Sequence, residues 1–310
     1  MLEYLILIAG IFLLIKGADW LISGGIALGK KLKWPDFLIG MTIIAFGTSL
    51  PELIISILAI IKNSEQIILG NLIGSNISNL LLILGILSLT GSIKIAKPSI
   101  NTDLFFSIIA TTLILTITFF STSISRPYGL ILLSLFFLFY YKKFQKAKID
   151  PDDLKQLNHA NFFKTYFPII IGSLALFLGG KLVVESVIII SQKLFFSEFL
   201  ISATIIAIGT SLPELITSLK ALMINKKSIA IGNITGSNLF NILWVLGLTS
   251  LIKPINFPTI FRLDLIFLII ASFLFFTIMF IGKKYKLTKK KGIFLLALYL
   301  MYLIMIMIRG

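Results

Sequence analysis

The chain has 310 residues, of which 57% are hydrophobic and only 13% charged, and its mean hydropathy of +1.03 excludes an ordinary water-soluble globular domain. It contains no cysteine, which excludes a disulfide framework, a thiolate metal site and a cysteine nucleophile. A net charge of +15 would suggest nucleic-acid binding in a soluble protein, but here the lysines lie between apolar runs and are typical of membrane-surface anchors. We therefore expect a polytopic membrane protein whose surroundings are the lipid bilayer, with no nucleic-acid partner.

Ten apolar runs separated by polar breaks follow one another along the chain. A bilayer-spanning helix needs about 20 mostly apolar residues. The first run carries Lys16 and Asp19 and lacks a small-residue cleavage site, so we expect it to be a retained helix and not a signal peptide. The pattern predicts an all-α membrane protein with ten transmembrane helices near residues 2–28, 36–62, 66–90, 103–122, 127–142, 164–192, 198–224, 228–252, 262–282 and 291–308.

The distribution of Lys and Arg predicts the orientation in the membrane. The connections after the first, third, fifth, seventh and ninth runs hold 19 of these residues, and the opposite side holds 6. The positive-inside rule therefore places the 19-rich side in the cytoplasm and both termini outside the cell membrane. The longest polar connection, residues 143–163, is expected to be cytoplasmic and is too short for a folded regulatory domain. It contains the single histidine, His159, which we interpret as a solvated loop residue.

An internal repeat is the strongest signal in the sequence. Residues 40–86 align without a gap on residues 202–248, at a constant offset of 162, and 25 of the 47 positions are identical. Shared hydrophobicity alone does not produce such a match. We therefore expect a duplicated unit, with a first five-helix repeat in residues 1–142, a linker in 143–163 and a second five-helix repeat in 164–310.

An odd number of helices in each repeat means that the second repeat enters the membrane from the opposite face. Two inverted repeats are typical of secondary transporters, whose sites lie near the midplane at the repeat interface. A stripe of small residues, spaced by seven, also recurs at the same offset: Gly10, Gly17 and Gly24, then Gly172, Gly179 and Ser186. The stripe is compatible with two interpretations, a smooth face on which the first and sixth helices slide as a pair, or tight static packing.

The sequence Gly-Thr-Ser-Leu-Pro-Glu-Leu-Ile occurs at 47–54 and again at 209–216, inside two apolar runs. A carboxylate in hydrocarbon costs a few kcal/mol, so Glu52 and Glu214 need a compensating charge. Lys220 lies off the helical face of Glu214 near the membrane surface, and the first repeat has Leu58 in its place. A transported cation is therefore the predicted counter-charge.

Two other acidic residues lie within apolar runs but do not match between the repeats. Asp19 and Glu185 are off-centre, and Lys16 and Lys181 are the plausible local partners. For this pair of acids we expect structural ion pairs.

The residues around the glutamates supply oxygen ligands. Pro51 and Pro213 lack an N–H, so the helix is expected to kink before each glutamate and to free backbone carbonyls. Ser49 and Ser211 lie three residues before the glutamates on the same helical face and add hydroxyl oxygens. Such unwound backbone is tolerated at this depth where it lines a cavity or an ion site.

A second motif, Gly-Asn-x-x-Gly-Ser-Asn-x-x-Asn, occupies residues 70–79 and 232–241. Its glycines, four residues apart, allow close helix packing. Ser75 and Asn79, like Ser237 and Asn241, are four residues apart, so each pair presents oxygens on one helical face. A set of oxygen ligands without Cys or intramembrane His is compatible with Ca²⁺, Na⁺ or Mn²⁺, with Ca²⁺ the better choice because two carboxylates neutralise it.

Both motifs, each present twice at matched positions, resemble the calcium/cation antiporters, in particular the prokaryotic sodium/calcium exchanger branch. The resemblance covers essentially the whole chain, and its members have ten helices in two inverted repeats. It implies transported Ca²⁺ and Na⁺, no cofactor, and a diamond of cation sites in which Glu52 and Glu214 are shared by both ions. It also implies ligands from Thr48, Ser49, Ser75, Thr210, Ser211 and Ser237, and from the carbonyls of Ala45 and Ala207.

One position departs from the pattern of some relatives. Certain archaeal and potassium-dependent members have an aspartate where this chain has Asn241, which mirrors Asn79. The difference removes a third acid, argues against potassium dependence and leaves the ion stoichiometry open.

The predicted function is electrogenic exchange of Na⁺ for Ca²⁺ by alternating access. Proton-coupled Ca²⁺ antiport is the alternative, because two facing glutamates would take up protons when no metal is bound. A passive cation channel with a glutamate ring is disfavoured by the inverted repeat within one chain. A hydrolase using Ser49 or Ser211 would lack a mid-membrane base, so we expect no enzymatic activity. We expect no protein partner, and a monomer.

Overall fold

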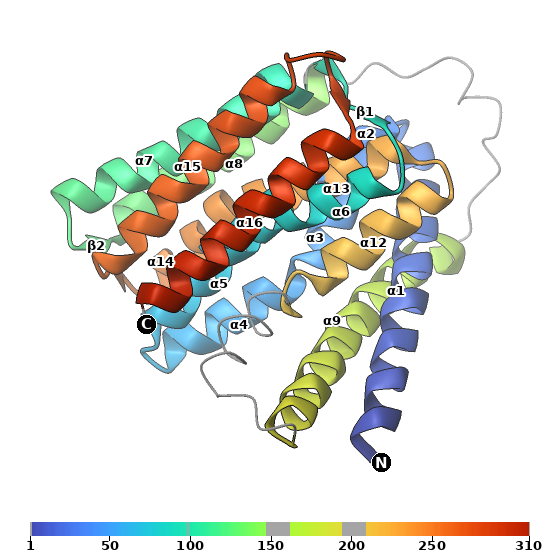
Figure 1. Ribbon diagram of the computed structural model, residues 1–310, viewed down its shortest axis with the longest axis horizontal. Helices are drawn as coiled ribbons and strands as arrows, with labels where there is room; N and C mark the ends of the chain where they lie inside the picture. Colours follow the sequence, from blue (N-terminus) through green and yellow to red (C-terminus); the bar gives the residue numbers. More distant parts are fainter. Residues whose placement is uncertain (1, 98, 147–161, 194–208, 310) are drawn as a thin grey trace. The chain divides into compact units, whose positions relative to one another are not determined.

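The computed structural model describes residues 2–97, 99–146, 162–193 and 209–309 (Figure 1). The first half contains the helices α1 (Leu2–Leu32), α2 (Asp36–Ile39), η1 (Gly40–Ile44), α3 (Ala45–Thr48), α4 (Leu50–Ile61), α5 (Glu65–Ile77), η2 (Ser78–Ile83), α6 (Leu84–Leu89), η3 (Ser99–Leu104), α7 (Phe105–Phe120) and α8 (Arg126–Lys146). The second half contains α9 (Phe162–Lys193), α12 (Leu212–Met223), α13 (Lys227–Leu239), η6 (Phe240–Val245), α14 (Leu246–Ile252), α15 (Ile260–Ile278) and α16 (Lys289–Arg309). The elements labelled η are π-helices.

Seven helices in the described residues are long and apolar enough to cross a membrane, or eight if the pair formed by residues 36–48 and 50–61 is one broken span. The protein is therefore an all-helical, multi-pass membrane protein, as the composition predicts. The predicted span 198–224 lies only partly within the described residues, which resume at residue 209. Helix α8 covers the predicted run 127–142 but is not among the seven.

Contacts divide the chain into two compact units, and each draws on both halves of the sequence. The first unit comprises Met1–Leu50, Lys146–Gly236 and Leu303–Gly310. The second unit comprises Pro51–Gln145 and Ser237–Tyr302. The predicted division into residues 1–142, 143–163 and 164–310 describes the internal repeat and not the contacts between segments. The two compact units do not test this division, so it stays a prediction.

In the first unit, the glycine stripes of α1 and α9 pack against each other along two neighbouring helices (Figure 1). A Cβ placed on Gly17 would lie 2.9 Å from both the carbonyl oxygen of Gly172 and the amide nitrogen of Leu176. A Cβ on Gly179 would lie 2.8 Å from the carbonyl oxygen of Gly10. The stripe is thus the contact surface within the pair, which agrees with tight packing, and sliding of the two helices as a pair stays a prediction.

We expect Gly17→Leu to lower the thermal stability of the purified protein. The larger side chain would meet the backbone of α9, which cannot move aside as a flexible side chain can, and such overpacking costs about 1–3 kcal/mol. Ala9→Leu is the matched control, because Ala9 lies on the exposed side of the same helix. Equal melting temperatures for the two variants would contradict this packing.

Close backbone contact also joins α13 to the segment that precedes the first glutamate motif. A Cβ on Gly232 would lie 2.3 Å from the carbonyl oxygen of Phe37, and one on Gly236 would lie 2.4 Å from that of Met41. Only glycine allows this approach. The close-packing role predicted for the glycines of the second motif is confirmed in its second copy.

One predicted ion pair has a different partner. The Nζ of Lys220 lies 2.9 Å from a carboxylate oxygen of Asp19, so Asp19 pairs with a lysine 201 residues away rather than with Lys16. The Nζ of Lys181 lies 3.8 Å from Glu185, as the four-residue spacing predicts, although both side chains are more than half exposed. Lys220 is therefore engaged in a pair that does not include Glu214.

In the second unit, α15 packs against α7 and α5, and two short strand pairs join connections that are distant in sequence (Figure 1). Strand β1 (Ile93–Lys94) pairs antiparallel with β4 (Lys286–Leu287), and β2 (Ser123–Ile124) pairs antiparallel with β3 (Ile255–Asn256). Each strand has only two residues, which is too short for a sequence pattern to reveal.

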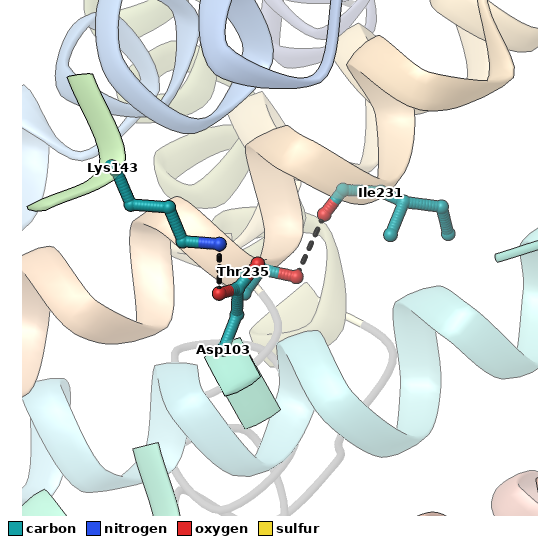
Figure 2. A network of polar contacts seen from close by, with 4 residues as sticks. All are labelled: Asp103, Lys143, Ile231 and Thr235. Atoms are coloured by element: carbon teal, nitrogen blue, oxygen red, sulfur yellow. Dashed lines mark hydrogen bonds and ion pairs between the residues drawn. The ribbon is translucent and has the colours of Figure 1, made fainter. Parts of the chain in front are cut away.

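The second unit also buries a carboxylate that belongs to neither of the two repeated motifs. Asp103, fully buried in η3, forms an ion pair with Lys143 of α8 (Figure 2). The pairing compensates a charge that would otherwise be costly at the start of a membrane span. Asp264, 161 residues later and one residue out of register with the repeat, is also buried.

Candidate cation site

The helix breaks before each glutamate with the same backbone geometry. Ser49 has φ −89° and ψ 7°, and Ser211 has φ −89° and ψ 4°, so both residues leave the α-helical region. A new helix begins at the next residue in both copies. Glu52 and Glu214 consequently lie in the first turns of α4 and α12. A helix N-terminus favours negative charge, which lowers the cost of an ionised carboxylate there.

Both glutamates are completely buried, with 0% exposure. In the first unit, the hydroxyl of Ser49 donates a hydrogen bond of 3.2 Å to Oε1 of Glu214. A serine from the first copy of the motif thus meets the carboxylate of the second copy, although 165 residues separate them. Glu52 belongs to the second unit.

Two asparagine side chains donate hydrogen bonds to the backbone carbonyls of the two glutamates. The Nδ2 of Asn71 donates to the carbonyl oxygen of Glu52, and that of Asn233 donates to the carbonyl oxygen of Glu214, each at 3.4 Å. Asn233 also accepts a hydrogen bond of 3.1 Å from the hydroxyl of Thr48 and donates one of 3.0 Å to Ser218. Their identical positions in the two copies of the second motif are the signal in the sequence that marks these two asparagines.

The second unit contains the last two asparagines of each copy of the second motif. Asn79 and Asn241 are completely buried, and Ser75 and Ser237 are buried beside them in sequence. Asn79 donates a hydrogen bond of 3.0 Å to Oδ1 of Asn238, across the two halves of the chain. The group of Asn79 that reaches the opposite half is thus its amide nitrogen, and the prediction that these residues turn oxygens toward the other half stays a prediction.

Asn79 and Asn241 also occupy equivalent places in π-helical turns. Each is the second residue of its π-helix, in η2 and η6 respectively. The amide of Leu84 donates to the carbonyl of Asn79, and that of Leu246 donates to the carbonyl of Asn241. Short π-helical turns inside α-helices are frequently found at functional sites.

Residues 2–144 and 164–308 match a family described as sodium/calcium exchanger protein. This chain belongs to that family. The sodium/calcium exchanger MaX1 of Methanosarcina acetivorans is 28% identical to it, with 98% of both chains covered. The inner membrane protein YrbG of Escherichia coli is 31% identical, with 87% of this chain and 86% of YrbG covered.

Solved structures of the sodium-calcium exchanger NCX_Mj resemble this exchanger along almost its whole length. The form soaked with 2.5 mM Na⁺ and 1 mM Sr²⁺ matches with a TM-score of 0.81 and 30% identity, over 97% of both chains. The form soaked with zero Na⁺ and Ca²⁺ matches with a TM-score of 0.78 and 29% identity, also over 97% of both chains. The fold is therefore that of a sodium/calcium exchanger.

Ala45, Thr210 and Ser211, which are also predicted for the exchanger's site, lie at or just before the helix breaks. The carbonyl of Ala45 already accepts the N–H of Ser49 at 2.9 Å and the hydroxyl of Thr48 at 3.2 Å. Thr210 is partly exposed at the second break, whereas Ser211 is buried and its hydroxyl makes no hydrogen bond within the described residues. Ala207 lies outside the described residues.

Neutral oxygens outnumber carboxylates around these positions. Within the part of the chain that the structure describes, no three His, Cys, Asp or Glu side chains gather in one place. The described candidate groups are two carboxylates, several hydroxyls and two side-chain amides. Carboxylate, hydroxyl and amide oxygens are the ligands that hard cations such as Ca²⁺ and Na⁺ prefer.

Proposed function

We propose that this exchanger moves Na⁺ and Ca²⁺ in opposite directions across the membrane by alternating access. The observation that carries the proposal is the pair of fully buried glutamates, each placed at the start of a helix by the same break. Membership of the sodium/calcium exchanger family supports the choice of ions. The transported cations supply the compensating charge that two buried carboxylates require.

We propose that the two glutamates and the neutral oxygens around them are ligands of the transported ions. The hydrogen bond between Ser49 and Glu214 and the burial of the second-motif amides support this assignment. The proposed ligand set consists of Glu52, Glu214, Ser49, Ser211, Thr48, Thr210, Ser75, Ser237, Asn79, Asn241 and the carbonyls of Ala45 and Ala207.

The proposed architecture is ten membrane spans in two inverted five-helix repeats, residues 1–142 and 164–310. The local structure supports the duplication, because the breaks at Ser49 and Ser211 and the π-helices η2 and η6 recur at the offset of 162 found in the sequence. An odd number of spans in each repeat makes them inverted. We propose that the protein acts as a monomer.

The proposed orientation has both termini outside and residues 143–163 in the cytoplasm. Two contacts support the grouping of the connections. The β1–β4 pair joins two connections that are both assigned to the cytoplasm, and the β2–β3 pair joins two that are both assigned outside.

Single cysteines introduced by Lys286→Cys and Ser123→Cys test this orientation. Each lies in a short strand at one of the two assigned faces. In the proposed orientation, a membrane-impermeant thiol reagent applied outside intact cells should label position 123 and spare position 286. The chain has no native cysteine, so any label reports the introduced residue. The reverse labelling would invert the topology.

Flux into proteoliposomes tests the function. An outward Na⁺ gradient should drive ⁴⁵Ca²⁺ uptake, whereas an imposed pH gradient of equal driving force should not. Uptake driven only by the pH gradient would show proton-coupled antiport instead. A unitary conductance in planar bilayers would show a channel and contradict alternating access.

A further inference from the structure

Four buried asparagines in the second unit form a symmetric set of crossed hydrogen bonds. The Nδ2 of Asn76 donates to the backbone carbonyl of Asn238 at 3.1 Å, and the Nδ2 of Asn238 donates to the backbone carbonyl of Asn76 at 3.4 Å. The Nδ2 of Asn241 donates to Oδ1 of Asn76 at 3.1 Å, and the Nδ2 of Asn79 donates to Oδ1 of Asn238 at 3.0 Å. Each bond has its counterpart 162 residues away.

The two backbone carbonyls determine which way every amide points. A carbonyl oxygen only accepts, so Asn76 and Asn238 must turn their NH₂ groups toward these carbonyls. Their Oδ1 atoms then face outward as acceptors. Asn79 and Asn241 must therefore present NH₂ to them. The only group left over on each of these last two side chains is its carbonyl oxygen.

These two remaining oxygens have no hydrogen bond in the described structure. Oδ1 of Asn79 and Oδ1 of Asn241 are buried, and no described donor reaches either atom. Asn79 and Asn241 are both 0% exposed to solvent. A buried acceptor without a partner costs about 1–3 kcal/mol, so the arrangement needs an occupant that binds neutral oxygen. A hard cation such as Na⁺ or Ca²⁺ is such an occupant.

We propose that Asn76 and Asn238 are positioning residues, whose crossed hydrogen bonds hold Oδ1 of Asn241 and Asn79 toward the transported cation. The proposal rests on the proposed function, in which Asn79 and Asn241 are ligands. Asn76 and Asn238 contribute no ligand atom themselves, since both ends of each amide are already engaged.

The crossing makes the proposal specific. Asn76 orients Asn241, and Asn238 orients Asn79. In Asn76→Ala, the backbone carbonyl of residue 76 is retained, so Asn238 keeps its orientation and so does Asn79. Removing the Asn76 side chain should therefore release the amide of Asn241 alone.

Equilibrium ⁴⁵Ca²⁺ binding to the purified full-length chain tests this with double-mutant cycles. Asn76→Ala and Asn241→Ala should each weaken binding by about fivefold or more, the effect of one lost or misdirected oxygen ligand. The double variant should bind no more than about twofold more weakly than Asn241→Ala, because an absent amide needs no positioning. The mirror cycle of Asn238 with Asn79 should behave in the same way.

The same-half pair is the matched control. Asn76→Ala and Asn79→Ala share no hydrogen bond, so their effects on Ca²⁺ affinity should multiply. If the fold-changes in Ca²⁺ affinity multiply in the crossed cycles as they do in the same-half cycle, the positioning role is overturned. Asn76 and Asn238 would then contribute only to packing. If Asn76→Ala does not fold, Asn76→Ser and the mirror cycle give the same comparison.

Two further results separate this proposal from the proposed function. If Asn79→Ala and Asn241→Ala both keep wild-type Ca²⁺ affinity while Na⁺-driven exchange persists, the positioning role is overturned and the exchanger assignment stands. If the wild-type chain neither binds nor exchanges Ca²⁺, both fall. The changes in melting temperature should not be non-additive for the crossed pairs alone. Non-additive melting temperatures in the crossed pairs, with additive ones in the same-half pair, would show a structural coupling and overturn the proposal.

Discussion

Glu52→Gln and Glu214→Gln should each abolish measurable Na⁺-driven Ca²⁺ transport. Either change removes one of two buried anions, so the site loses half of the charge that compensates a divalent ion. Removing one partner of a buried ion pair costs about 3–5 kcal/mol, which corresponds to a loss of roughly 100-fold or more in affinity. The amide keeps the size of the side chain, so the protein should still insert and fold. Initial rates of ⁴⁵Ca²⁺ uptake into proteoliposomes measure the effect.

Glu185→Gln is the matched control. Glu185 also lies in a membrane-spanning helix, but its side chain is 54% exposed and pairs with Lys181. Exposed pairs of this kind contribute about 1 kcal/mol or less. Transport should therefore remain close to wild type. Substantial transport by either Glu52→Gln or Glu214→Gln would contradict the assignment of the cation ligands.

The exchange rate should depend on membrane voltage. With both glutamates ionised the empty site carries −2, and moving this charge through a low-dielectric barrier is prohibitive. One Ca²⁺ brings the charge to zero, and three Na⁺, the number that the family resemblance suggests, bring it to +1. Asn79 and Asn241 add no charge. Only loaded states can then switch, and one net positive charge moves with Na⁺ in each cycle.

An inside-negative potential should accelerate Na⁺-driven Ca²⁺ efflux. One elementary charge in the full field gains about 2.3 kcal/mol per 100 mV, so a transition state halfway across gives roughly a sevenfold change in rate. Liposomes clamped with K⁺ and valinomycin at several potentials measure this dependence. A voltage-independent rate together with no net current would establish electroneutral exchange and exclude the three-sodium occupancy.

The helices and the breaks in them follow from local sequence, and the structure agrees with those predictions. Pro51 and Pro213 have no N–H to donate, and the chain leaves the helical region two residues earlier at Ser49 and Ser211. The burial of Glu52 was also predictable, because it lies deep in an apolar run and has no matched lysine.

Contacts between distant segments were less predictable. Asp19 pairs with Lys220 rather than Lys16, because helix packing brings together residues that sequence separation does not relate. The glycine stripe was visible in the sequence, but only the contact between α1 and α9 decides which surface it faces. The crossed amides depend on the direction of each side chain, which spacing alone leaves undetermined.

Competition between Na⁺ and Ca²⁺ at equilibrium tests most directly whether both ions use the same two carboxylates. Bound ⁴⁵Ca²⁺ on the purified chain is measured against increasing Na⁺ at constant ionic strength, with choline as the replacing cation. Mutually exclusive occupancy predicts that Na⁺ displaces Ca²⁺ completely and with a Hill coefficient above one, because more than one Na⁺ replaces each Ca²⁺. Ca²⁺ binding that persists at saturating Na⁺ would contradict a shared site at Glu52 and Glu214.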